Sequence, residues 1–99
     1  MARYHKGRAF EYKVRDLLKE MGFAVFRCAA SKPVDLIALK KDAPPILVEC
    51  RTSHKPTSRR REELEKLAEK SGAILLVAEK ERLDEFKREV EALLCRRLM

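Results

Sequence analysis

The sequence predicts an α/β fold with a mixed central sheet, in the order helix, three strands, helix, strand and helix. Apolar residues between positions 10 and 21 recur with helical spacing, whereas short apolar segments between 23 and 51 are separated by turn residues. A strand, a helix and another strand then follow between 46 and 78, which favours a parallel crossover. The 99 residues suffice for one domain, so we expect a single domain over 1–99.

The first helix is indicated by one apolar stripe on its surface. Its side chains lie at i, i+4, i+7, i+8 and i+11, and they are Phe10, Val14, Leu17, Leu18 and Met21. Gly22 follows the stripe directly, at a position where helices commonly end. We therefore expect the first helix to end at this glycine.

Three strands are expected over 23–27, 34–39 and 46–51. The second of these segments is almost wholly apolar, and the segment 42–45, Asp-Ala-Pro-Pro, indicates a turn between the second and third strands. Such closely spaced strands form an antiparallel meander, which we expect to follow the first helix.

The second half of the chain is expected to supply the crossover and a last helix. Thr57 or Ser58 can cap a helix over about 59–71, and residues 73–78 form a short apolar strand. A third helix is expected over about 82–97, with an apolar face made of Leu83, Phe86, Val90, Leu93 and Leu94. This face either packs on the sheet of its own chain or helps to pair two copies.

The distribution of charge indicates a polyanionic partner. Residues 1–61 hold 15 Lys or Arg against 6 Asp or Glu, whereas residues 62–99 hold 8 against 10, for a net charge of +7. A basic half on a small domain is typical of proteins that bind a phosphate backbone. A solvated lysine-rich surface is the alternative. We expect no membrane partner, because neither a long apolar segment nor a basic amphipathic helix with aromatic anchors is present.

The cysteines indicate a reducing compartment. Cys28, Cys50 and Cys95 are odd in number and widely spaced, so they match neither a disulfide framework nor a zinc site. We expect them to be small buried apolar residues of a cytoplasmic, nucleoid-associated protein.

Two acidic residues interrupt apolar strands. Asp35 lies within Val-Asp-Leu-Ile-Ala-Leu, and Glu49 lies within Ile-Leu-Val-Glu-Cys. A charge inside such a strand is costly unless it is paired or bound to a metal. If the two strands pair about the turn at 42–45, both acids fall at the same end of the hairpin, nearly opposite each other and on one face.

A divalent cation would relieve the repulsion between such carboxylates, and Mg²⁺ accepts carboxylate oxygens together with water and phosphate oxygens. Arg51 follows Glu49 by two residues and so points to the same face. Glu11, which lies off the apolar stripe of the first helix, is the third candidate acid. The alternative is structural, with Asp35 and Glu49 forming salt bridges to Arg27 and Arg51.

The motifs that carry these acids resemble the restriction-endonuclease-like nucleases, and most closely the archaeal Holliday junction resolvases of the Hjc type. The matching segments are 6–11 (Lys-Gly-Arg-Ala-Phe-Glu), 22–38 (from Gly-Phe-Ala-Val to Val-Asp-Leu-Ile-Ala) and 48–52 (Val-Glu-Cys-Arg-Thr). The resemblance extends over about residues 3–79. It implies a core of helix, three-stranded meander and crossover, αβββαβ, to which this chain adds a C-terminal helix.

The resemblance also implies roles for individual residues. Glu11, Asp35 and Glu49 would be metal ligands, joined by the backbone carbonyl of Cys50, and these three acids with Arg51 would form the catalytic set. Arg27 would lie near the scissile phosphate. The residues expected to contact DNA are Arg3, Lys6, Arg8, Arg27, Ser31, Lys32, Lys55, Arg59, Arg60 and Arg61.

The implied activity is cleavage of two opposed strands of a four-way DNA junction by a homodimer, through Mg²⁺-dependent hydrolysis, with Mn²⁺ as a substitute. The sequence departs from the family pattern in having Arg51 where the motif has Lys, and Tyr12 where Arg is common. A third departure is that a helix, rather than further sheet, is expected after Ala78. Because Arg stays protonated and cannot act as a base, a DNA-binding paralogue with weakened chemistry is one alternative. Two others stay open as well: a metal-dependent DNase with another DNA substrate, and a basic scaffold without a site.

Overall fold

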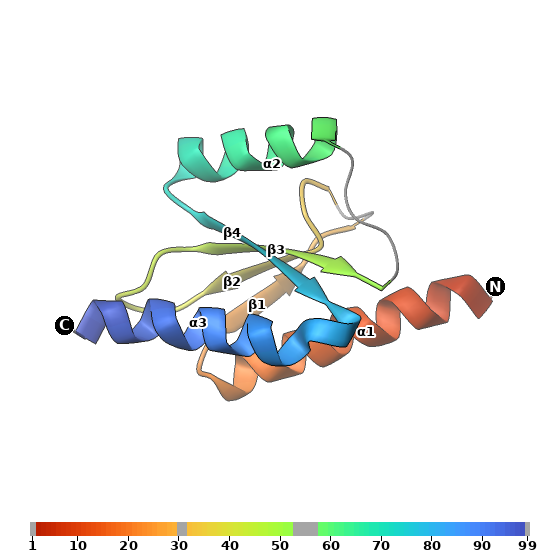
Figure 1. The fold of residues 1–99 in the computed structure, drawn as a ribbon, viewed down its shortest axis with the longest axis horizontal. Coiled ribbons are helices and arrows are strands. Elements are labelled where there is room, and N and C mark those ends of the chain that lie inside the picture. Colours follow the sequence, from red (N-terminus) through yellow and green to blue (C-terminus); the bar gives the residue numbers. More distant parts are fainter. Residues whose placement is uncertain (1, 30–31, 53–57, 99) are drawn as a thin grey trace.

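A computed structural model describes residues 2–29, 32–52 and 58–98 of the chain (Figure 1). The expected order of elements is confirmed, with one added 3-10 turn before the last helix. The elements are α1 (Ala2–Glu20), β1 (Ala24–Arg27), β2 (Leu36–Leu39), β3 (Ile46–Arg51), α2 (Ser58–Ser71), β4 (Ile74–Glu79), η2 (Lys80–Arg82) and α3 (Leu83–Leu98).

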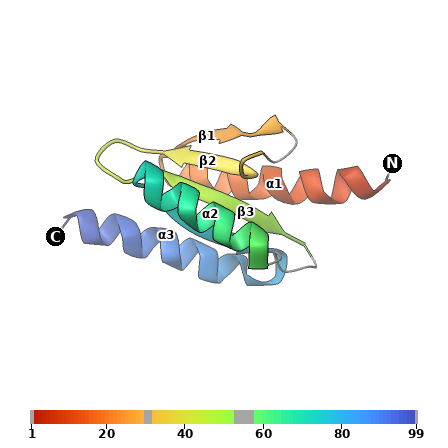
Figure 2. The ribbon, with the colours of Figure 1, turned by 90° about the horizontal axis from the view of Figure 1, so that it is seen from above.

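The four strands form one mixed sheet in the order β1-β2-β3-β4. The pairs β1–β2 and β2–β3 are antiparallel, whereas β3 and β4 are parallel and are joined through α2. The predicted meander and crossover are therefore both confirmed. Helix α2 covers one face of the sheet, and α1 and α3 lie together on the other (Figures 1 and 2).

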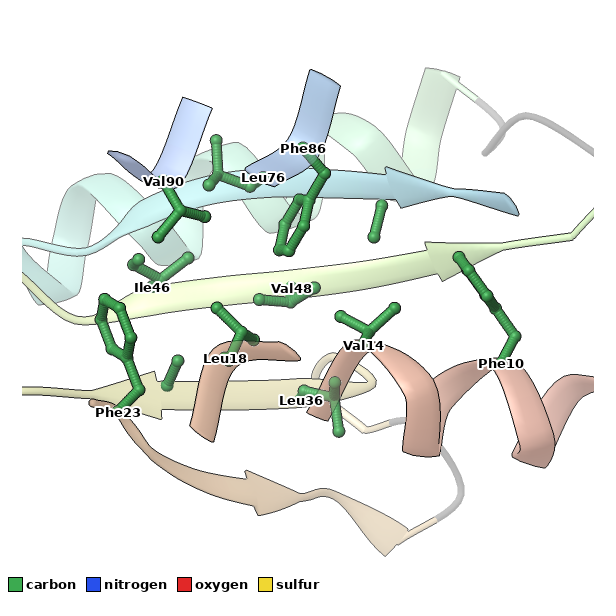
Figure 3. Packing of buried hydrophobic residues seen from close by; sticks show 12 residues of the cluster. Phe10, Val14, Leu18, Phe23, Leu36, Ile46, Val48, Leu76, Phe86 and Val90 are labelled. Carbon is green, nitrogen blue, oxygen red and sulfur yellow. The ribbon is translucent and has the colours of Figure 1, made fainter. Parts of the chain in front are cut away.

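The main core fills the space between the sheet and the helices α1 and α3 (Figure 3). The predicted stripe of α1 contributes Phe10, Val14 and Leu18, all of them buried. Phe86 and Val90 of α3 are fully buried in the same cluster. The apolar face of α3 therefore packs on the sheet of its own chain, as one of the two alternatives expected. A second, smaller cluster lies under α2 and includes Leu47, Leu64 and Ala68.

Gly22 ends α1 as expected. It adopts a φ of +96°, which a glycine reaches without steric cost. Its N–H donates to the carbonyl of Lys19, and the Phe23 N–H donates to the carbonyl of Leu18, so the last carbonyls of the helix are satisfied. The chain can then reverse directly into β1.

The second strand is shorter than predicted. It was expected to begin at Val34, but β2 begins at Leu36, so Asp35 precedes the strand and does not interrupt it. The reason is a side-chain hydrogen bond: Asp35 Oδ2 accepts the backbone N–H of Cys50 at 2.7 Å, which ends the regular ladder between the two strands. The cysteine prediction was also partly wrong, because Cys95 is exposed while Cys28 and Cys50 are half-buried.

Among the described helices, not one combines the length and the apolar character that crossing a membrane requires.

Candidate functional site

Asp35 and Glu49 lie at the same end of β2 and β3. The register pairs Leu36 with Val48, so Asp35 and Glu49 are the next residues along these two segments. Both are buried, with 6% and 1% of their surface exposed, and they are the buried charged residues among those described. The hairpin geometry predicted from the sequence is therefore present. Burial of two carboxylates in one place has a high cost unless cations or hydrogen-bond donors compensate it.

Two guanidinium groups provide this compensation at Glu49. Arg51 donates from Nη2 to Glu49 Oε2 at 2.7 Å, and Arg60 donates from Nε to Oε2 and from Nη2 to Oε1, each at 3.0 Å. The predicted placement of Arg51 on the same face as Glu49 is confirmed. The contact of Arg60 was not predicted, because Arg60 had been assigned with its neighbours to the DNA phosphates. Both oxygens of Glu49 are thus engaged in the structure.

Asp35 is held differently, by backbone groups. Its side chain accepts the Cys50 N–H, and its backbone carbonyl accepts the Cys28 N–H at 3.0 Å. The salt bridge expected between Asp35 and Arg27 under the structural alternative is not among the ion pairs of the described residues. Arg27 Nε instead donates to Glu11 Oε1 at 2.8 Å. This hydrogen bond, followed by the attraction of the Glu11 charge, raises the pKa of Arg27 against a lowering by desolvation.

All three predicted acids act electrostatically on Cys50. Burial raises the pKa of the Cys50 thiol, and the negative charges of Asp35, Glu11 and Glu49 raise it further, in that order. A raised pKa favours the protonated thiol near neutral pH. Acids from α1, from the segment before β2 and from β3 thus all act on this one thiol.

Comparison with known proteins assigns this arrangement to a family. The family model described as archaeal Holliday junction resolvase (Hjc) matches residues 2–95. The chain belongs to the archaeal Holliday junction resolvase family. The crossover junction endodeoxyribonuclease Hjc of Methanocaldococcus jannaschii is 49% identical over 53 residues, which cover 54% of this chain and 39% of that protein.

A solved structure is similar over a larger part of the chain. The Holliday junction resolvase Hjc of Archaeoglobus fulgidus matches with a TM-score of 0.66 and 26% identity, over 76% of this chain and 64% of that one. The chain thus spans less than two thirds of the length of either relative. The restriction-endonuclease-like core expected from the sequence is confirmed by this match.

Nucleases of the Hjc family are in general metal-dependent, so the donor set must be compared with the needs of a cation. The carboxylates of Asp35 and Glu49 and the carbonyl of Cys50 are hard oxygen donors of the kind that Mg²⁺ prefers. Within the described residues, however, no group of three or more His, Cys, Asp or Glu is arranged to hold a metal. The donor types fit a hard cation, and the guanidinium groups of Arg51 and Arg60 neutralise Glu49.

One donor of Arg51 lacks a partner in the part of the chain that the structure describes. Its Nε atom is buried and has no hydrogen-bond partner among the described residues. A buried donor without an acceptor costs free energy.

The remaining predicted DNA contacts that the structure describes lie on the surface. Arg8 and Lys32 are exposed, and Arg59 and Arg61 form surface pairs with Glu63 and Glu65. Four other predicted contacts lie outside the described side chains, namely Arg3, Lys6, Ser31 and Lys55. Tyr12, the other departure from the family motif, receives the guanidinium of Arg15 over its ring at 4.6 Å.

Proposed function

We propose that this chain is a metal-dependent endonuclease that resolves four-way DNA junctions. Membership of the Hjc family supports the reaction and the substrate class. The observation that carries the proposal is the burial of Asp35 and Glu49, 6% and 1% exposed, at the same end of adjacent strands. Proteins rarely bury two acids together unless they are paired or bind a cation.

We infer that Asp35, Glu49 and the carbonyl of Cys50 would hold Mg²⁺, with Glu11 contributing from α1 and Mn²⁺ as a substitute. When bound, the cation would polarise the scissile phosphate and supply hydroxide at neutral pH. The backbone of Cys50 fixes the carboxylate of Asp35 through its N–H, so this acid is positioned before any ligand arrives. Such fixed geometry reduces the reorganisation that catalysis requires.

The arginines would act on the phosphate. Arg51 keeps its positive charge at any working pH, so it stabilises negative charge in the transition state and does not act as a base. Its side chain is 23% exposed, so part of it is open to a phosphate. Arg27 donates a hydrogen bond to Glu11, which fixes the orientation of its guanidinium.

Recognition of the junction would rest on charge and shape. Phosphate contacts position a protein on DNA without reading its sequence, which suits an enzyme that recognises a branched structure. We infer contacts from Arg8, Lys32, Arg59 and Arg61, together with Arg3, Lys6, Ser31 and Lys55, which were predicted from the sequence. The affinity for DNA is therefore expected to fall steeply as salt is raised. A DNA substrate would place the chain inside the cell, with the nucleoid.

A second candidate is a DNA-binding protein of the same fold that has lost the chemistry. The observation in its favour is that Arg51 and Arg60 engage both oxygens of Glu49. A tightly neutralised carboxylate binds a cation less readily, and Arg51 stands where the family motif has Lys.

One experiment separates the two candidates. The chain is incubated with labelled four-way junction or linear duplex, in Mg²⁺ or in excess chelator, beside the variant Asp35→Asn. For the endonuclease we expect cleavage of the junction in Mg²⁺ alone, and loss of cleavage with retained binding in the variant. Binding without cleavage in the unaltered chain supports the second candidate. Cleavage in excess chelator would contradict the metal role.

We further infer that two copies act together, because paired cuts on opposed strands need two sites. The register places Ala24 opposite Leu39, so β1 and β2 share an apolar face on which Phe26 is 56% and Leu39 is 41% exposed. Helix α2 lies over β3 and β4 and leaves this face uncovered (Figure 2). Sedimentation is expected to show a dimer, and Phe26→Glu is expected to shift it toward monomer. A monomer with and without DNA would contradict the paired cut.

A further inference from the structure

The first turn of α2 carries three consecutive arginines that differ in environment. Arg59 and Arg61 are 91% and 67% exposed, and they pair at 3.6 Å with Glu63 and Glu65 along the helix surface. Arg60 is 34% exposed and reaches Glu49 across the interface with the sheet. The difference follows from helical spacing, because Arg60 precedes buried Leu64 by four residues on the face that packs against the sheet.

The contact between Arg60 and Glu49 has the geometry of a counter-ion. Two nitrogens of one planar guanidinium donate to two oxygens of one carboxylate, each at 3.0 Å. The hydrogen bond with Glu49 and the charge of Asp35 raise the pKa of Arg60 despite some desolvation, so both buried acids act on this guanidinium. Arg60 Nη2 also donates a longer hydrogen bond, at 3.4 Å, to the carbonyl of Pro33.

We propose that Arg60 competes with the divalent cation for Glu49, and that cation binding releases its guanidinium for a DNA phosphate. This rests on the proposed function, because it assumes that the cation binds at Glu49. Oε2 of Glu49 already accepts from both Arg51 and Arg60, so a cation that binds Oε2, or chelates both oxygens, has to displace a guanidinium donor. The two ligands carry the same sign of charge, so they repel each other when they are close.

The exchange has a physical advantage over a permanently open site. If neither a cation nor Arg60 bound Glu49, Arg51 alone would have to compensate the cost of this buried charge. With a cation, the charge of Arg60 is surplus in the site, and its planar group suits a phosphate. Helix α2 would thus link occupation of the metal site to binding of the DNA backbone.

The test measures Mn²⁺ binding in the absence of DNA, by calorimetry or by the electron paramagnetic resonance signal of free Mn²⁺. Arg60→Gln is compared with Arg59→Gln and Arg61→Gln, which remove the same charge from the same turn without touching Glu49. We expect Arg60→Gln to bind Mn²⁺ about tenfold or more tightly than the unaltered chain, since a charge-assisted hydrogen bond no longer has to be broken. The two controls are expected to differ by about twofold or less, as exposed charges are screened.

Equal tightening in all three variants, or weaker binding in Arg60→Gln alone, would overturn the competition. Glu49→Gln separates this failure from failure of the proposed function. If the unaltered chain binds no more Mn²⁺ than Glu49→Gln does, the metal site is wrong as well. Circular dichroism checks the fold of each variant. Should Arg60→Gln not fold, Arg60→Lys replaces it, and it is expected to bind Mn²⁺ more tightly than the unaltered chain because an ammonium cannot engage both oxygens in a fork.

Discussion

Replacing Glu49 with Gln removes one charge from the centre of the site while keeping the shape of the side chain. The carboxylate accepts three hydrogen bonds from two guanidiniums, at 2.7, 3.0 and 3.0 Å, and it is 1% exposed. Breaking a buried ion pair by removing one partner costs about 3–5 kcal/mol. The side chains of Arg51 and Arg60 are 23% and 34% exposed, so water can partly solvate the two guanidiniums that lose their partner. We therefore expect a loss of about 2–3 kcal/mol.

Urea unfolding followed by circular dichroism measures this loss, since the chain has no Trp. For a chain of this size the melting temperature should fall by about 10–20 °C. The matched control is Glu63→Gln, which removes an exposed acid paired with Arg59 at 3.6 Å and should change stability by about 0.5 kcal/mol or less. Equal losses in the two variants, or no loss in Glu49→Gln, would refute the inference that guanidiniums stabilise a buried ionised Glu49.

Three further predictions concern chemistry, pH and packing. Arg51→Lys is expected to preserve or raise junction cleavage in Mg²⁺, and a large fall in the cleavage rate would show that the guanidinium itself is needed. Because the raised pKa of the Cys50 thiol lies above its ordinary value of 9.0, the unfolded chain ionises first. Above pH 9 the free energy of unfolding should therefore fall with pH, by up to about 1.4 kcal/mol per pH unit from this thiol. The unaltered chain and the control Cys95→Ala should show this extra fall, and Cys50→Ala should not. Parallel slopes in the three chains would contradict the prediction. Phe86→Ala should cost about 3–4 kcal/mol in urea unfolding, and a loss below about 1 kcal/mol would show that α3 is not part of the core.

Local spacing was sufficient to predict most of the fold. The stripe from Phe10 to Met21 has a period that only a helix satisfies, and the turn at 42–45 fixes which residues of the hairpin face each other. Hence the side-by-side placement of Asp35 and Glu49 could be predicted. The start of β2 could not, because it depends on a bond between the Asp35 side chain and the backbone of another strand.

The counter-ions of the acids were predicted only where they are local. Arg51 is two residues from Glu49 on the same strand, so the period of a strand places it correctly. Arg60 and Arg27 reach Glu49 and Glu11 from other elements, 11 and 16 residues away. A run of three arginines does not by itself indicate which one faces the sheet. The spacing of Arg60 from Leu64 and Ala68 was the available signal, and its meaning depends on knowing where the crossover helix packs.

The position of β3 has a consequence for the dynamics of the site. This strand pairs with β2 over Ile46–Val48 and with β4 over Ile46–Arg51, and it carries Glu49 and Cys50, whose N–H is held by the Asp35 carboxylate. In such a sheet the amide protons of the central strand exchange with deuterium most slowly, because they become accessible only when most of the molecule opens. Thermal fluctuation that loosens the helix ends would therefore leave Glu49 and Cys50 in place. The position of Arg60 on α2 would vary more.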